Sequence, residues 1–300
     1  MGGPTAGERR RAVLRVQPPF ALNSRKIPTV TSSHPRPLSE LRPSHLPVTA
    51  LDLKSEHPGG RLMYLPGSPE RAARIASHFD QRRVIPGSRG FDVHLGVLRF
   101  EDQVVDVGAV ATGMGCPSLE IVVTELLALG ARRFVRVGTA GTLVADRVKA
   151  SDVVIATGSV RDAAACDAYA PREFPAIASL DMVLGLQQAA HRLKLDAVTH
   201  IGLVHTKDSF YAREYGYGPL AEQHARYMSV LASCGVLASE MEAAQLFLLA
   251  QVYSSVTQPA AAGCVLGIVG DTDSMADDSS RELAEERAIS IALEAARGLP

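Results

Sequence analysis

The segment from 111 to 141 (ATGMGCPSLEIVVTELLALGARRFVRVGTAG) constrains the fold more than any other part of the chain. It begins with a glycine-containing turn. Ile121, Val122, Leu126 and Leu129 then recur at helical spacing and predict a helix with an apolar face. The β-branched and aromatic run FVRV follows and predicts a buried strand. The segment therefore places a helix directly before a buried strand, with a glycine turn at each end.

Arg136 lies inside this predicted strand. A guanidinium group among apolar side chains is costly to bury unless an anion meets it. Gly138, Thr139 and Gly141 follow directly, and glycines allow a backbone to curl closely around a small ligand. The strand and the turn together predict a site for an anion of about the size of phosphate.

Composition excludes several classes of protein. Of the 300 residues, 46% are hydrophobic and 21% are charged, as in ordinary globular proteins. The net charge of −1 gives no general attraction to nucleic acid or to an anionic membrane. The longest apolar runs are too short to span a bilayer. We therefore expect neither nucleic acid nor membrane as a partner.

The four cysteines and nine histidines show no metal-ligand spacing, because C-x-x-C and H-x-x-x-H pairs are both absent from the sequence. We expect no metal and no disulfide framework, and free thiols in a reducing cytosol. The cysteines are Cys116, Cys166, Cys234 and Cys264.

Residues 1–44 differ in composition from the rest of the chain. They are rich in Pro, Ser and Arg, and Glu8 and Glu40 are their only acidic residues. Such a segment cannot bury enough apolar surface to offset its chain entropy, so we expect it to be disordered. An Arg-rich, acid-poor terminus also fits an organelle transit peptide, although Pro18 and Pro19 interrupt any long amphipathic helix. A flexible tail on a cytoplasmic protein is the favoured interpretation.

Residues 45–300 alternate between strand and helix patterns and predict one domain. A strand at 61–66 leads to a helix starting at Pro69, with Ser68 as its cap. A closing helix is expected to start at Ser279, with Glu282 at capping-box spacing. Further strands are expected at 91–99, 103–111, 152–157, 198–205 and 265–269, and further helices at 180–193, up to Ser233 and over 237–253. This alternation predicts an α/β fold with a central mixed, largely parallel sheet flanked by helices.

Thr112-Gly113-Met114-Gly115 resembles half of a dinucleotide-binding fingerprint. Ser118 stands where a third glycine would be needed, and no acidic residue follows at the required distance. The turn is therefore not expected to bind a nicotinamide or flavin cofactor.

Three acidic residues could carry chemistry. Glu240 and Glu242 flank Met241 at the start of a predicted helix, where acids also favour the helix dipole. Alternatively, Glu242 accepts hydrogen bonds from a vicinal diol while Met241 packs against a sugar. Asp271 lies beside a glycine after a strand, so it is either a turn residue or a proton donor to a leaving base. The spacing alone leaves both alternatives open.

The sequence resembles the nucleoside phosphorylase family that includes uridine phosphorylase and the hexameric purine nucleoside phosphorylases. The likeness covers residues 45–299 and is closest to the uridine enzymes. Six motifs carry it in the family's order: LPGSPERAARIA (65–76), SRGF (88–91), ATGMGCPS (111–118), RVGTAG (136–141), KDSFY (207–211) and ASEMEAA (238–244).

The resemblance implies a phosphate site. Gly67, Arg71, Arg136 and Thr139 match the family's phosphate ligands within one subunit, and Arg89 matches an arginine that reaches the neighbouring subunit's phosphate. A site completed by a neighbour implies a homo-oligomer with a dimer as its minimal active unit, and the family often forms hexamers.

The resemblance also implies a ribose site. Glu240, Met241 and Glu242 match the family's ribose-binding trio, with Glu242 on the hydroxyl groups. His45 matches a histidine that crosses the dimer interface to the ribose 5′-hydroxyl. Thr112 becomes part of the wall of the ribose–phosphate pocket.

The base site departs from the family pattern. Phe210 matches an aromatic residue that packs on the base or sugar, and Gly113 is expected beside the base. Uridine phosphorylases commonly have Gly-Gln-x-Arg after the Phe-Tyr pair. Here Tyr211 is followed by Ala-Arg-Glu, so Arg213 and Glu214 are the candidate substitutes.

The implied reaction is reversible phosphorolysis of a nucleoside, with inorganic phosphate as co-substrate and no cofactor. Arg136, Glu242 and Asp271 are the expected catalytic residues. The segment 212–234 is similar to an insertion of the uridine group and favours uridine, giving uracil and ribose 1-phosphate. Asp271 lies where purine enzymes carry a proton-donating aspartate, so a purine nucleoside phosphorylase stays an alternative. A non-catalytic nucleoside-binding module with the same fold is a second alternative.

Overall fold

The computed structural model describes residues 1–2, 36–255, 257–271 and 274–299. The chain divides into two units, residues 1–36 and 37–300. Most of the predicted disordered extension falls at 3–35, outside the described residues, and its boundary at 44 stays a prediction. The strands and α-helices of the described residues all lie in the second unit.

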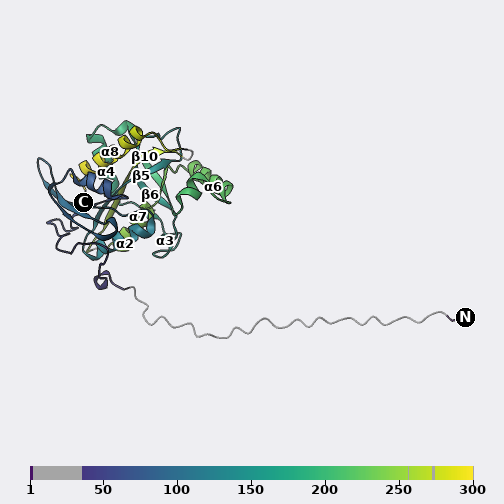
Figure 1. The fold of residues 1–300 in the computed structure, drawn as a ribbon, viewed down its shortest axis with the longest axis horizontal. Helices are drawn as coiled ribbons and strands as arrows, with labels where there is room; N and C mark the ends of the chain where they lie inside the picture. Colours follow the sequence, from purple (N-terminus) through teal and green to yellow (C-terminus); the bar gives the residue numbers. More distant parts are fainter. Residues whose placement is uncertain (3–35, 256, 272–273, 300) are drawn as a thin grey trace. The chain divides into compact units, whose positions relative to one another are not determined.

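Strands and helices alternate along this unit, as predicted (Figure 1). The strands are β1 (Leu62–Pro66), β2 (Asp80–Ile85), β3 (Val93–Arg99), β4 (Val104–Val110), β5 (Arg133–Thr142), β6 (Val153–Asp162), β7 (Ala176–Ile177), β8 (Thr199–Lys207), β9 (Ala238–Glu240) and β10 (Ala261–Gly270). The α-helices are α1 (Pro69–Ala76), α2 (Cys116–Ala128), α3 (Ala164–Asp167), α4 (Leu180–Arg192), α5 (Phe210–Tyr215), α6 (Ala221–Ser233), α7 (Ala243–Val252) and α8 (Asp278–Ala295). Short 3₁₀ turns lie at Leu38–Glu40, Ser88–Gly90 and Asp196–Val198.

The strands form one mixed sheet, which confirms the predicted fold class. Parallel pairing joins β1 to β4 and β5, β5 to β10, β6 to β8, and β8 to β9. Antiparallel pairing joins β2 to β3, β3 to β4, β5 to β9, β6 to β7, and β6 to β10. The pairings run from β5 through β10, β6, β8 and β9 back to β5, so these five strands close into a ring.

β5 has different neighbours along its length. β10 occupies one edge from Arg133 to Gly141. On the other edge, β1 pairs with β5 in parallel and its last paired residue lies opposite Val137. β9 pairs antiparallel with Gly141 and Thr142. β1 and β9 therefore approach from opposite directions, and residues 138–140 of β5 lie in the gap between their ends.

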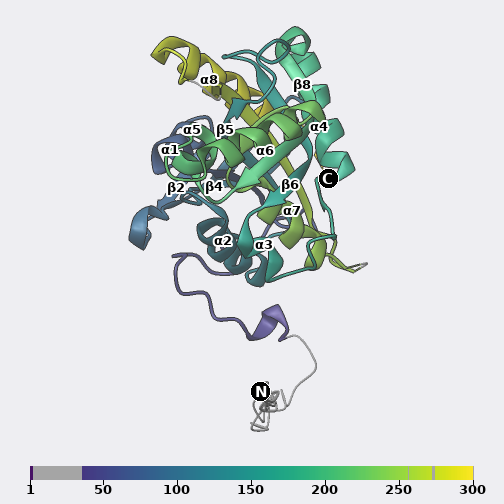
Figure 2. The ribbon, with the colours of Figure 1, turned by 90° about the vertical axis from the view of Figure 1, so that its right-hand side faces the viewer.

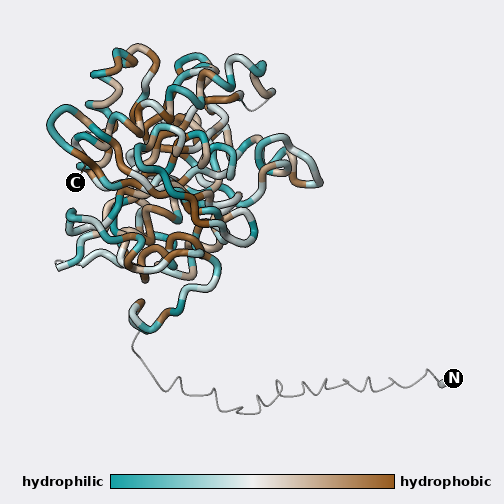
Figure 3. Tube along the Cα trace, turned by 60° about the vertical axis from the view of Figure 1, so that its left-hand side comes forward, coloured by the Kyte–Doolittle hydropathy of each residue, from teal (hydrophilic) through white to brown (hydrophobic). Residues whose placement is uncertain are grey.

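Helices cover both faces of the sheet, as predicted. α4 packs on α8 and both contact β10, whereas α7 packs on α2 and α3 and contacts β6. Figure 2 shows α4 and α8 on one side and α2, α3 and α7 on the other. Hydrophobic residues gather along the chain segments inside the unit (Figure 3). A smaller cluster of Met228, Leu231 and Val236 holds α6 in place. No helix in the described residues combines the length and the apolar character needed to cross a bilayer.

All four cysteines are free thiols, as predicted. Cys116, Cys166 and Cys264 are buried, and Cys234 is exposed.

Two predicted helix starts had different outcomes. Ser68 caps α1 as predicted, because its hydroxyl accepts from the Arg71 amide at 3.3 Å and Pro69 is the first helical residue. The prediction that Ser279 caps the closing helix is wrong. Asp277 is the cap, and its carboxylate accepts from the Ser280 amide at 3.0 Å. The preceding aspartate supplies a charged acceptor, and the helix therefore begins earlier.

The predicted helix over 237–253 is wrong in its first part. Ala238–Glu240 form β9, which pairs with β5 and β8, and α7 begins only at Ala243. The Glu240 carboxylate accepts from the amides of Glu242 at 2.9 Å and Ala243 at 2.8 Å. Pairing with two neighbouring strands thus overrides the local helix pattern, and Glu240 serves as a cap from the strand side.

Glu125 of α2 ties the segment before β1 to the domain. Its buried carboxylate accepts from the amides of Ser44 at 2.9 Å, His45 at 3.1 Å and Leu46 at 2.9 Å, and contacts the His45 ring at 2.8 Å. Burial raises the pKa of Glu125, but these hydrogen bonds outweigh burial and leave the pKa below its ordinary value of 4.5. The ionised form is therefore the one that holds this segment.

We expect Glu125→Ala to lower the free energy of unfolding by about 3 kcal/mol at pH 7, because one buried and two part-buried amides lose a charged acceptor. Because the pKa of Glu125 is lower in the folded than in the unfolded protein, its ionised carboxylate stabilises the fold at pH values above the unfolded-state pKa. This stabilisation is lost as the pH falls through the folded-state pKa. The difference from the native protein should therefore shrink below pH 4.5. Urea unfolding at several pH values measures it. Glu101→Ala, in an exposed turn, is the control and should cost less than about 0.5 kcal/mol. Equal losses of unfolding free energy in the two variants would contradict the stabilising role of Glu125.

Candidate active site

A cleft of about 670 Å³ opens beside the gap in the pairing of β5. It is built from chain segments that are far apart in the sequence but meet where β1, β8, β9 and β10 end. The residues that line it are Gly67, Arg71, Gly113, Met114, Arg136, Thr139–Gly141, Lys207–Tyr211, Glu214, Tyr215, Ser239–Glu242, Val269–Asp271 and Met275.

The cleft brings together most of the residues singled out in the sequence. These are Gly67, Arg71, Gly113, Arg136, Thr139, Phe210, Glu214, Glu240, Met241, Glu242 and Asp271. His45, Arg89, Thr112 and Arg213 are not among the lining residues. The roles of both groups stay predictions.

Arg136 is buried at the centre of the cleft wall, with 4% of its surface exposed. Its Nε donates to Glu240 Oε2 at 3.0 Å, and its Nη2 donates to Glu242 Oε2. Burial lowers the pKa of the guanidinium, but the charges of Glu242 and Glu240 reverse this effect and hold the pKa above its ordinary value. Its Nη1 is buried and has no acceptor within the described part of the chain. One side of this cation is therefore available to a further acceptor.

Arg71 follows the same pattern. Its Nη2 donates to Glu285 Oε1 of α8 at 2.6 Å, whereas its buried Nε has no acceptor in the described ranges. Gly67 lies just before α1 and adds backbone to the same wall. Two guanidinium groups that each keep a buried N–H unmatched are suited to an oxyanion with several acceptor oxygens.

The two glutamates differ in what they can still bind. Glu240 accepts from Thr206 Oγ1, Arg136 Nε and two backbone amides, so its oxygens are already occupied. Glu242 accepts from the Gly115 amide at 2.5 Å and from Arg136. Burial raises the pKa of Glu242, and the attraction of Arg136 opposes this rise without cancelling it. Glu240 therefore positions its neighbours, and Glu242 is the carboxylate better suited to meet a ligand.

Lys207 lines the cleft, and the sequence assigns it no role beyond membership of the motif KDSFY. It is 1% exposed at the end of β8, and its Nζ donates to Ser239 Oγ at 2.9 Å. It forms an ion pair with Glu214 and lies 5.7 Å from the centre of the Phe210 ring. Lys207 follows the buried residues Val204, His205 and Thr206, so a cation next to a buried run is the sequence signal that could have identified it.

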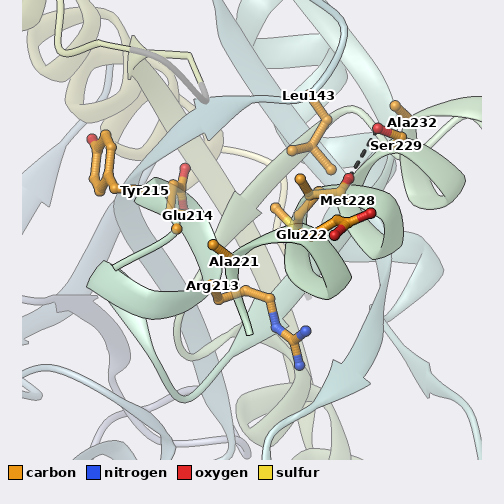
Figure 4. Close-up of a pocket in the computed structure, with 11 residues that line it drawn as sticks. Leu143, Arg213, Glu214, Tyr215, Ala221, Glu222, Met228, Ser229 and Ala232 are labelled. Carbon is orange, nitrogen blue, oxygen red and sulfur yellow. Dashed lines mark hydrogen bonds between the residues drawn. The ribbon is translucent and has the colours of Figure 1, made fainter. Parts of the chain in front are cut away.

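Arg213 lies behind the cleft wall. It forms an ion pair with Asp162 at 2.8 Å, and its guanidinium carbon lies 4.7 Å from the centre of the Tyr227 ring. It lines a second cavity, of about 570 Å³, which Glu214 and Tyr215 also line. Figure 4 shows the side chains of Arg213 and Glu214 pointing in opposite directions. One short helix thus separates the two cavities.

Asp271 belongs both to the cleft and to a turn. Its Oδ1 accepts from the Ser274 amide at 2.9 Å, which closes the turn after β10. The turn role is therefore observed, whereas proton donation to a leaving base stays a prediction.

Besides Arg213, three further predicted residues are not among those that line the cleft. His45 is held by Glu125, and Arg89 is exposed with a left-handed φ of 59°. Thr112 is fully buried behind the cleft, where its hydroxyl donates to the Pro66 carbonyl at 3.2 Å.

The described residues contain no group of three or more His, Cys, Asp or Glu side chains placed to hold a metal ion.

Comparison with known proteins identifies the family of the chain. Residues 61–297 match the family profile described as the phosphorylase superfamily. A uridine phosphorylase of Treponema pallidum (strain Nichols) is 34% identical over 257 residues, covering 84% of this chain and 92% of that protein. A uridine phosphorylase of Escherichia coli (strain K12) is 31% identical over 261 residues, covering 85% and 97%. A guanosine phosphorylase of Halorubrum lacusprofundi is 31% identical over 244 residues, covering 78% and 92%. The chain therefore belongs to the phosphorylase superfamily.

Proposed function

We propose that the protein catalyses the reversible phosphorolysis of uridine. A phosphate oxygen bonds to C1′ of the ribose while the bond from C1′ to N1 breaks, and the bonding electrons leave with the uracil. The proposal rests on the observation that Arg71 and Arg136 line one cleft, each with a buried nitrogen that has no acceptor in the described ranges. Two relatives named uridine phosphorylase support the choice of nucleoside.

In this proposal phosphate lies between the two guanidinium groups, with Gly67 and Thr139 beside it. Glu242 accepts hydrogen bonds from the ribose hydroxyls, and Met241 packs against the sugar. Holding both reactants in one cleft removes much of the entropic cost of their encounter. Fixed cations stabilise the charge that moves from phosphate to base. We propose phosphate as co-substrate, without a cofactor.

The proposed active unit is a homodimer or a larger assembly of such dimers. His45 and Arg89 lie outside the cleft of their own chain, although the family resemblance gives them roles at the ribose and phosphate. Supply of both side chains by a neighbouring subunit accounts for this placement.

We further propose a cytoplasmic location, because the four cysteines are free and three are buried as unpaired thiols. An organelle address in residues 1–44 is the alternative.

A purine nucleoside is the second candidate substrate. A relative is named guanosine phosphorylase, and Asp271 lies at the cleft, where it could donate a proton to a purine.

The purified protein should release uracil from uridine only when phosphate is present. Base release from uridine, thymidine, inosine and adenosine, each with and without phosphate, tests this expectation. Cleavage of inosine without cleavage of uridine would support the purine alternative. Nucleoside binding without base release would indicate a non-catalytic binding module.

Arg71 and Arg74 offer a matched test of the phosphate site, because both belong to α1 and both contact Glu285. Only Arg71 lines the cleft. We expect Arg71→Ala to reduce kcat/KM for phosphate by roughly 100-fold, as removal of a charge-assisted contact would. Arg74→Ala should stay within about threefold of the native protein. Steady-state kinetics with varied phosphate measures both, and similar losses in the two variants would remove Arg71 from the site.

Mixed dimers test the contribution of a neighbour. Arg89→Ala and Glu242→Gln should each be nearly inactive alone, but in a hybrid dimer one of the two sites keeps both native side chains. Random pairing after co-expression should therefore restore about a quarter of the native activity. An activity equal to the mean of the two parent variants would place Arg89 outside the neighbour's site.

A further inference from the structure

We propose that Lys207 and Glu214 read the edge of the nucleobase, as ammonium donor and carboxylate acceptor. This pair stands in for the Gln and Arg readers that the uridine enzymes commonly carry and this chain lacks. It selects bases in which a ring N–H lies next to a carbonyl group. The inference deepens the proposed function and rests on it.

The pair is placed at the cleft and shielded from water. Lys207 and Glu214 line the cleft, and only 2% and 3% of their side chains are exposed. Phe210 lines the same cleft, with its ring centre 5.7 Å from Lys207 Nζ. A base bound in this cleft beside Phe210 would lie within reach of the ion pair, because all three side chains line the same space. A buried ion pair recovers its desolvation cost only when further polar partners complete it, and a base edge is such a partner.

Gly141 makes room for the carboxylate. A Cβ at this position would overlap Glu214 Oε1, so the oxygen lies directly against the backbone of β5. Gly141 also pairs with Ser239, next to the Lys207 contact. The backbone is thus shaped to hold Glu214 at the cleft.

A chain of hydrogen bonds orients the ammonium group from behind. Lys207 Nζ has only donors, so Ser239 Oγ accepts from it at 2.9 Å. The Ser239 hydroxyl can then donate to His205 Nδ1 at 3.0 Å, which leaves His205 Nε2–H to donate to Asp162 at 3.2 Å. Arg213 contacts the same Asp162 carboxylate at 2.8 Å. Arg213 is therefore a positioning residue, acting through Asp162 and His205 rather than on the base.

The two charges match one hydrogen-bonding pattern. Uracil offers a donor, N3–H, between two carbonyl acceptors, so the carboxylate accepts from N3–H and the ammonium donates to a carbonyl. Cytosine offers a bare ring nitrogen and an amino group at these positions, which places an acceptor against Glu214 and a donor against Lys207. A polar site left unpaired by the wrong partner discriminates strongly against it.

The first test compares substrates on the native protein. With phosphate present, kcat/KM for uridine should exceed that for 3-methyluridine and for cytidine by at least roughly 100-fold. 3-Methyluridine keeps both carbonyls and lacks only the N3–H donor. Equal cleavage of uridine and 3-methyluridine would overturn the inference.

The second test replaces both charged residues at once, so that neither is left buried without its partner. In the double variant Lys207→Met/Glu214→Gln, kcat/KM for uridine should fall and the preference over 3-methyluridine should shrink to within about tenfold. Glu222→Gln is the control, since this exposed carboxylate lines only the second cavity, and it should leave the preference unchanged. Retention of both rate and preference in the double variant would overturn the inference.

Two further outcomes are informative. If circular dichroism shows that the double variant is unfolded, the inference is decided by the comparison of uridine with 3-methyluridine on the native protein. If the native protein releases no base from any nucleoside, the proposed function fails instead. Calorimetric binding of uracil against 3-methyluracil then decides the inference by itself: tighter binding of uracil supports the pair as reader, and equal binding refutes it.

Discussion

The buried contact of Arg136 with Glu240 and Glu242 is the interaction on which the site depends. It joins β5, β9 and the start of α7 through charged groups that are almost entirely removed from water. Loss of one member of such a cluster leaves an uncompensated buried charge, at a cost of about 3–5 kcal/mol. The cluster holds two carboxylates to one guanidinium, yet the guanidinium still has an unmatched nitrogen among the described atoms. The side chains that stabilise this part of the fold are therefore also those to which we assign phosphate and ribose.

The cleft follows from how the strands meet. β1 ends opposite Val137 and β9 begins its pairing at Gly141, so the edge of β5 between them has no strand partner in the described fold. Backbone and side chains at this gap face a space instead of a neighbouring strand. The closed ring of five strands keeps the ends of β8, β9 and β10 close to it. The walls to which we assign phosphate and base thus come from strands that run in opposite directions.

Much of this arrangement could be predicted from local signals. The apolar strand around Arg136, the cap at Ser68 and the alternation of strands and helices are each encoded within a few residues. β9 could not be predicted in this way, because its three residues form a strand only through pairing with β5 and β8. β2 was missed because its sequence, DQRRVI, is exposed and lacks an alternating apolar pattern. Arg213 was expected at the base because its position in the sequence could not reveal that it turns toward Asp162.

α5 separates the two cavities with only six residues, fewer than a helix needs to be stable in isolation. Ion pairs on opposite sides hold it, through Glu214 to Lys207 and through Arg213 to Asp162. Its order therefore depends on contacts that lie at or next to the cleft. Local unfolding of this segment and occupancy of the cleft are then thermodynamically linked. A substitution in the second cavity that loosens α5 would weaken ligand affinity without touching a ligand.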